Sequence, residues 1–227
     1  MLIAIPNVLD RDAALAMRAR LLGAEWIDGN ATSGAGAALA KRNRQLPEIG
    51  DAARDARNAV SAALSSNALF LSAALPRTIF PPLFNLYGLG DRFDPHVDNA
   101  IRVEPASGRA IRTDLSATLF LSEPADYDGG ELEISGRFGT TSYKLEAGDL
   151  LLYPSSSLHH VKQVKRGERV SAFFWLQSLV RDSEDREMLF ELDQVVQRLT
   201  AERGAGDGEV LRLTQLYHNL IRRWAEI

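Results

Sequence analysis

His96 and Asp98 are the residues whose types and spacing point most directly to chemistry. They stand two positions apart in residues 94–100, DPHVDNA, a segment with the character of a strand edge. Side chains two residues apart in an extended chain share one face. An imidazole and a carboxylate side by side need one more ligand to form the facial triad that binds Fe(II) in non-haem oxygenases. Because a His-x-Asp pattern alone is more often structural than ligating, the third ligand decides the interpretation.

The candidate third ligand lies in the segment LLYPSSSLHHV, where His159 and His160 are adjacent. If this backbone is extended, the two side chains point to opposite sides, so only one of them can face a metal. Three of the four histidines of the chain lie in these two segments, which favours a site over scattered structural histidines. The chain contains no cysteine, so any metal must be bound through nitrogen and oxygen atoms.

Arg169 and Ser171 form a second candidate group, at the start of the predicted strand RVSAFFWL. They share one face by the same period of two. A guanidinium inside a barrel is costly unless it is paired, and it can donate two parallel hydrogen bonds to a carboxylate. With the hydroxyl as a further donor, the pair suits the distal carboxylate of a dicarboxylic cosubstrate. A surface salt bridge at a strand start is the alternative interpretation.

The composition is that of an ordinary globular protein with a mildly acidic surface. The 227 residues are 45% hydrophobic and 25% charged, with a formal net charge of -4, which indicates one domain with a helical appendage. Nothing in it indicates a nucleic-acid partner. No segment approaches the roughly 20 apolar residues of a membrane span, and Pro6 interrupts the apolar start before it could serve as a leader. We therefore expect a cytoplasmic protein without membrane association.

The N-terminal part, residues 1–78, has the pattern of a framework of helices and a short strand. Apolar periodicity predicts a helix over about Arg11–Leu22. A second helix is expected over about Pro47–Ser65, with its proline in the first turn. Between them, residues 29–42 are rich in Gly, Ala, Ser and Thr. We interpret this segment either as a lid over a site or as an ordinary surface loop.

Residues 79–180 change to short apolar runs that are separated by turn signals such as YDGGE and EAGD. Strands at this spacing indicate an all-β sandwich or barrel of the jelly-roll kind, with an open end for a ligand. The six predicted strands lie in PPLFNLYGLG, LSATLFLS, GGELEIS, TTSYKLEAGD, LLLYPSS and VSAFFWLQSLV.

The C-terminal part, residues 181–227, returns to helical periodicity. Apolar stripes over residues 188–199 and 211–224 predict two helices, separated by a loop at GAGDG. These helices are expected to pack on the barrel or on a second copy of the chain, so we expect a homo-oligomer that assembles through them.

Three longer segments carry a family resemblance: NLYGLGDRFDPHVDNAIR, LSATLFLSEPADYDGGEL and LLYPSSSLHHVKQVKRGERVSAFFW. They resemble the bacterial PKHD-type hydroxylases, which are Fe(II)- and 2-oxoglutarate-dependent dioxygenases related to prolyl 4-hydroxylase. The resemblance runs over almost the whole chain, including the helical C-terminus. It implies a mainly β fold, in which a double-stranded β-helix core is flanked by N-terminal helices and followed by a C-terminal helical extension.

The resemblance also implies the roles of individual residues. The iron ligands implied are His96, Asp98 and His159, whereas His160 lies outside the ligand set. Arg169, with Ser171 beside it, is implied to bind 2-oxoglutarate. Tyr87 matches a position where relatives place a tyrosine near the cosubstrate, although a core aromatic residue would explain it equally well. No catalytic residue beyond the metal centre is expected.

The activity implied is hydroxylation of an unidentified small-molecule or peptidyl substrate, using Fe(II) and O2, with decarboxylation of 2-oxoglutarate to succinate. L-ascorbate is a further cofactor that the resemblance suggests, and relatives often accompany iron-uptake systems. Related halogenases replace the carboxylate ligand with a small residue. Because Asp98 is present, the resemblance favours hydroxylation over halogenation.

Two rival hypotheses come from other functional classes. A cupin-type metal-binding protein, either an isomerase or a non-catalytic sensor, would need the three ligands but not Arg169. An interaction module would use its C-terminal helices for assembly and bind no metal at all. A further hypothesis places Arg102 and Arg112 at the open end of the barrel, where they would meet an acidic substrate; solvent-exposed positions are the alternative for both.

Overall fold

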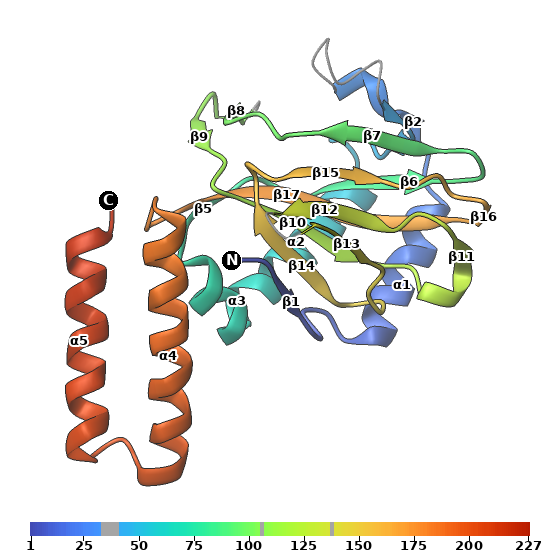
Figure 1. Cartoon of the computed structure of the whole chain (residues 1–227). Coiled ribbons are helices and arrows are strands. Elements are labelled where there is room, and N and C mark those ends of the chain that lie inside the picture. The colour runs from blue at the N-terminus through green and yellow to red at the C-terminus, as the bar shows by residue number, and fades with distance from the viewer. Residues whose placement is uncertain (33–40, 105–106, 137–138) are drawn as a thin grey trace.

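The computed structural model of the chain describes residues 1–32, 41–104, 107–136 and 139–227. Two antiparallel β-sheets form the body of the molecule (Figure 1). The larger sheet has eight strands, paired in the order β1 (Ile3–Ile5), β14 (Leu150–Pro154), β10 (Leu115–Phe120), β17 (Arg169–Ser178), β6 (Leu83–Tyr87), β4 (Arg44–Gln45) and β2 (Ile27–Asp28), with β5 (Pro76–Ile79) also beside β17.

The smaller sheet has five strands, paired in the order β13 (Gly139–Tyr143), β12 (Leu132–Gly136), β15 (Leu158–Val161), β7 (Arg92–His96) and β3 (Lys41–Arg42). Two further strand pairs lie outside these sheets: β8 (Ile101–Val103) with β9 (Ala110–Arg112), and β11 (Tyr127–Asp128) with β16 (Arg166–Gly167). Each of the six apolar runs that predicted a strand contains one. The predicted jelly-roll core is therefore confirmed.

Alternation of residues along the central strand β17 separates an apolar outer face from an inner face that carries polar groups. Four residues of its outer face belong to the main hydrophobic core: Val170, Ala172, Phe174 and Leu176. The same core includes residues of α1 (Arg11–Leu22), α2 (Asp51–Ser66) and α3 (Ala68–Ala74). The inner residues of β17 are Arg169, Ser171, Phe173 and Trp175. The three helices thus cover the outer face of the larger sheet and leave its inner face to the site.

The second predicted helix begins later than the sequence pattern indicated. The expected start at Pro47 is wrong: α2 runs over Asp51–Ser66, and Gly50 occupies its N-cap position. Backbone pairing between β4 and β6 continues as far as Leu46, whose N–H donates to the carbonyl of Phe84. Pro47 therefore follows a strand instead of starting a helix. The proposed lid over residues 29–42 falls largely outside the described residues, and its last two residues form β3.

The C-terminal part forms a helical hairpin of α4 (Ser183–Arg203) and α5 (Gly208–Trp224), beside the sheets in Figure 1. An apolar cluster joins its base to the core, and Leu189 and Val180 are buried there. Arg112 reinforces this junction, because its guanidinium pairs with Asp114 at 2.6 Å and with Glu226 at 2.8 Å. These ion pairs give Arg112 a structural role in place of the hypothesised contact with substrate.

None of the helices in the described ranges combines the length and the apolar character that crossing a bilayer requires.

The packing of the larger sheet against its helices predicts the effect of a core truncation. Leu119 on β10 is 0% exposed within the main core, so Leu119→Ala is expected to lower the free energy of unfolding by about 2–5 kcal/mol, measured by urea denaturation. Leu89→Ala serves as the control because that side chain is 76% exposed, and a change within about 0.5 kcal/mol is expected. Equal losses in the two variants would contradict the assigned packing.

Candidate metal centre

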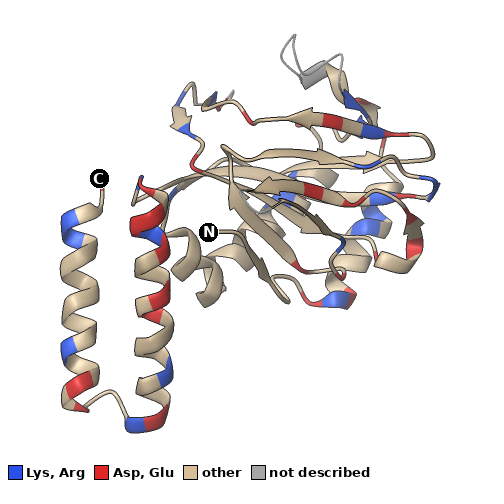
Figure 2. Ribbon diagram, in the orientation of Figure 1, with Lys and Arg blue, Asp and Glu red and all other residues tan. Residues whose placement is uncertain are grey.

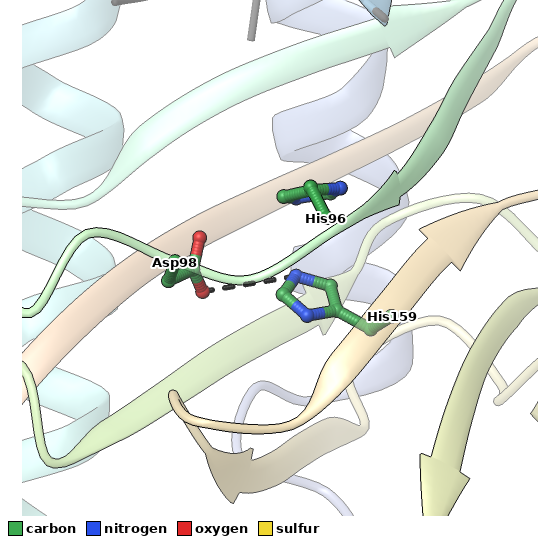
Figure 3. A group of neighbouring side chains, drawn as sticks. All are labelled: His96, Asp98 and His159. Carbon is green, nitrogen blue, oxygen red and sulfur yellow. Dashed lines mark ion pairs between the residues drawn. The ribbon is translucent and has the colours of Figure 1, made fainter. Parts of the chain in front are cut away.

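The pairing of β7 with β15 brings the candidate ligands together. His96, the last residue of β7, stands directly opposite His159 of β15 in the strand register. Asp98 lies two residues beyond the end of β7 and turns its carboxylate toward the same point, as Figure 3 shows. Donor atoms of the three side chains lie within 4.8 Å of one another. The distance from His159 Nε2 to Asp98 Oδ2 is 3.7 Å. We call this group the His-Asp-His cluster.

The two adjacent histidines point to opposite sides, as the extended backbone predicted. His159 is buried, with 4% of its surface exposed, and faces the cluster. His160 points away, and its Nε2 atom lies 3.1 Å from Oε2 of Glu133. Of the two histidines, only His159 therefore belongs to the cluster.

Backbone carbonyls orient both imidazole rings of the cluster. His96 Nδ1 lies 2.9 Å from the Asp94 carbonyl, and His159 Nδ1 lies 2.9 Å from the Ser157 carbonyl. A carbonyl can only accept a hydrogen bond, so Nδ1 carries the proton and Nε2 keeps the lone pair that binds a metal. Burial and the neighbouring His159 lower the pKa of His96 to about 4. Its ring is therefore neutral near pH 7, which is the ligating form.

Two buried serines, which the sequence analysis missed, hold the carboxylate of the cluster. Ser116 on β10 donates to Asp98 Oδ2 at 2.6 Å, and its hydroxyl is 2.7 Å from that of Ser155. The loop is fixed further because Thr113 Oγ1 donates to the Asn99 carbonyl at 2.5 Å. A sequence pattern that could have predicted this role of Ser116 is the period of two in LSATLFLS, which places Ser116 on the face of its strand opposite the apolar one.

Arg169 is a buried cation on the inner face of β17, with 1% of its surface exposed. Its Nη1 donates to Ser171 Oγ at 2.8 Å, and that hydroxyl donates to Asn85 Oδ1 at 2.5 Å. The Tyr87 ring lies 5.3 Å from the guanidinium carbon. No carboxylate among the described residues forms a salt bridge with Arg169, and its Nε has no hydrogen-bond partner there. An unpaired buried guanidinium is costly, so the site is suited to an anion.

One cavity is lined both by the His-Asp-His cluster and by Arg169. Tyr87 also lines it, whereas Ser171 does not line it and is fully buried. Burial raises the pKa of Tyr87 to about 12, so its hydroxyl keeps a proton to donate. The remaining lining is mainly apolar and aromatic; it includes Leu132, Val161, Phe93, Phe173 and Trp175. Such a lining excludes water from the reacting groups.

The donor set of the cluster fits a divalent transition metal. Two imidazoles and one carboxylate, all on one side, are the ligands of the 2-His-1-carboxylate Fe(II) site, which leaves coordination positions open for other ligands.

Two family models match the chain in succession. Residues 82–177 match the 2OG-Fe(II) oxygenase superfamily, and residues 183–226 match the PKHD-type hydroxylase C-terminal domain. Curated relatives match over the full length: PKHD-type hydroxylases of Rhizorhabdus wittichii and Burkholderia thailandensis are each 58% identical over 226 residues, which is 100% of both chains.

Solved structures share the fold at low sequence identity. A Pseudomonas putida prolyl-4-hydroxylase is 23% identical, with a TM-score of 0.52, and the match covers 78% of this chain and 92% of that one. A prolyl hydroxylase from Trichoplax adhaerens, in complex with a peptide of hypoxia inducible factor, is 15% identical, with a TM-score of 0.55 and coverage of 83% and 86%. These likenesses support the double-stranded β-helix fold.

The hydrogen bond from Ser116 to Asp98 predicts a loss of metal affinity when it is removed. Ser116→Ala leaves the carboxylate free to rotate, so Co(II) binding, measured by titration calorimetry, is expected to weaken by roughly 10-fold. Ser65→Ala, on the exposed surface of α2, is the matched control and should bind Co(II) as the wild type does. Unchanged affinity in Ser116→Ala would show that this hydroxyl does not position the ligand.

Proposed function

We propose that His96, Asp98 and His159 bind the catalytic Fe(II) of this chain, which belongs to the PKHD-type hydroxylases of the 2OG-Fe(II) oxygenase superfamily. The chain is thus a 2-oxoglutarate-dependent hydroxylase. Bound Fe(II), with O2 and 2-oxoglutarate, supplies the oxidising chemistry that hydroxylates a substrate and yields succinate and carbon dioxide. The protein binds and orients the reactants and excludes water.

The unpaired Arg169 carries the assignment of the cosubstrate site. Its guanidinium is buried in the cavity that the His-Asp-His cluster also lines. 2-Oxoglutarate has two carboxylates, so one can reach the metal while the other accepts two hydrogen bonds from Arg169. Ser171 supports this contact by accepting from Nη1 and donating onward to Asn85, which fixes the guanidinium plane. Tyr87 is assigned as a further donor to the cosubstrate, since its protonated hydroxyl lines the same cavity.

Hydroxylation follows from the carboxylate ligand. Asp98 occupies the position that halogenases leave to halide, and Ser116 holds it in place. The cupin-type alternative would leave the buried charge of Arg169 without a function, and the cost of that charge argues against it.

The substrate is proposed to be a small molecule or a peptidyl residue. Solved relatives illustrate both kinds: the Trichoplax adhaerens enzyme is in complex with a peptide, and HygX of Streptomyces hygroscopicus, with a TM-score of 0.51, has hygromycin B bound. A link to iron uptake, support by L-ascorbate and a cytoplasmic location stay predictions from the sequence. Assembly through the C-terminal hairpin is also proposed, because Met188, Val195, Leu211 and Leu216 are exposed there.

Succinate formation tests the proposed function. Protein loaded with Fe(II) without oxygen, given 2-oxoglutarate and then exposed to air, is expected to form succinate. His96→Ala should abolish it, because the cluster loses a ligand. Arg169→Ala should raise the KM for 2-oxoglutarate by roughly 30-fold, since a charged hydrogen bond contributes about 2 kcal/mol.

Arg166→Ala is the control for Arg169→Ala, because Arg166 is an exposed arginine in the preceding strand whose partner is Asp128. Its KM should equal that of the wild type. Tight Fe(II) binding without affinity for 2-oxoglutarate would favour the cupin-type alternative, and an unchanged KM in Arg169→Ala would remove Arg169 from the site.

A further inference from the structure

A second arginine, Arg102, stacks on Trp175 near the end of β17 that lies away from Arg169. Arg102 is on β8, where its neighbours Ile101 and Val103 are exposed and Arg102 points inward. Its guanidinium carbon lies 3.7 Å from the ring centroid of Trp175 and 5.3 Å from that of Phe80. Trp175 lines the cavity and Arg102 does not, so the guanidinium borders the cavity by stacking on one of its wall residues. Figure 2 shows basic residues on this β8–β9 hairpin.

Lys41 brings another cation to the same cavity. It pairs with Phe93 in the register between β3 and β7, and it lines the cavity. Its Nζ is 5.9 Å from the ring centroid of Phe173, and it donates to the Gly29 carbonyl at 3.0 Å and to Gln45 Oε1 at 3.2 Å. Both acceptors are neutral, so neither supplies a counter-charge to the ammonium group.

Neither cation is neutralised by a carboxylate in the part of the chain that the structure describes. No salt bridge joins an acid there to Arg102 or Lys41, and the buried Nε of Arg102 has no hydrogen-bond partner. Burial is the main cause that lowers the pKa of Lys41 to about 8, and the charge of Arg102 is the second. The ammonium group therefore keeps its proton near pH 7, and its charge is destabilised by these surroundings. Acids act on both cations without forming a salt bridge: Asp28 on Lys41, and Asp98 and Glu48 on Arg102.

The geometry of β17 separates Arg102 from the cosubstrate site. Arg169 and Trp175 are six residues apart on the same face of one strand, which corresponds to roughly 20 Å at about 3.3 Å per residue. 2-Oxoglutarate is a five-carbon acid, so a molecule bound to Arg169 and the metal cannot also reach the guanidinium above Trp175. The charge of Arg102 is therefore left for another ligand.

We propose that Arg102 and Lys41 bind an anionic group of the substrate, such as a carboxylate, and that Phe173 and Trp175 pack against the adjoining part of the molecule. The inference rests on the proposed function and narrows it to anionic substrates. The guanidinium and the ammonium position the anion by charged hydrogen bonds, and the aromatic walls supply apolar contact. The substrate is then held beside Phe173 and Trp175, with Lys41 near the first ring and Arg102 on the second.

A matched pair of small probes tests this inference. Protein is loaded with Mn(II) and titrated with benzoate or with benzamide, its neutral isostere, with and without saturating 2-oxoglutarate. The wild type is expected to bind benzoate at least about 10-fold more tightly than benzamide, which corresponds to about 1.4 kcal/mol. In Arg102→Gln, and separately in Lys41→Gln, the preference should fall below about 3-fold while the affinity for 2-oxoglutarate stays within about 2-fold.

Arg109→Gln is the control, because Arg109 is exposed near the same hairpin and should keep the full preference. Equal affinity of the wild type for the two probes would overturn the proposal. Loss of 2-oxoglutarate affinity in Arg102→Gln would overturn it as well, by assigning that charge to the cosubstrate. If the wild type prefers benzoate but binds no 2-oxoglutarate, the anion site stands and the proposed function fails.

Discussion

The site depends on the antiparallel pairing of β7 with β15. That register sets His96 directly opposite His159, and the chain beyond β7 then returns Asp98 to the same point. A slip of one residue would turn His159 outward and bring His160 in, since successive side chains alternate between faces. Backbone carbonyls, Ser116 and Ser155 then fix the donor atoms. The proposed metal centre is thus a consequence of strand pairing, and the larger sheet supplies the Ser116 hydroxyl that holds its carboxylate.

The inner face of the cavity is organised by unpaired positive charge. Arg169 is buried at one end of β17, Arg102 is stacked on Trp175 toward the other, and Lys41 lies beside Phe173. Arg169 and Lys41 line the cavity and Arg102 stacks on its wall, and a buried cation without a counter-charge is costly, which favours anionic ligands. We propose that Arg169 binds the cosubstrate and that Arg102 and Lys41 bind an anionic group of the substrate. On the outer face of the same strand, Val170, Ala172, Phe174 and Leu176 belong to the main hydrophobic core, which gives these groups a rigid support.

Local patterns were enough to predict six core strands, the helical ends of the chain and the His-x-Asp segment, but not short strands such as β3, β4 and β8. Periodicity also correctly implied that only one of His159 and His160 could face the cluster. Contacts between distant segments could not be predicted in this way: Ser116 reaches Asp98 across the sheets, Lys41 reaches the cavity through β3, and Arg112 pairs with Glu226. Pro47 was assigned to a helix because proline is common in first turns, but pairing with β6 held that segment extended.

The most direct test of this account is whether metal and 2-oxoglutarate share one site with Arg169. Binding of 2-oxoglutarate is measured by calorimetry with and without Mn(II), in the wild type and in Arg169→Ala. Coupling between two ligands in contact is reciprocal, so Mn(II) is expected to tighten 2-oxoglutarate binding by at least about 10-fold, and 2-oxoglutarate should tighten Mn(II) binding equally. The variant should bind 2-oxoglutarate weakly under both conditions. Affinity for 2-oxoglutarate that is independent of the metal, or of Arg169, would contradict the account.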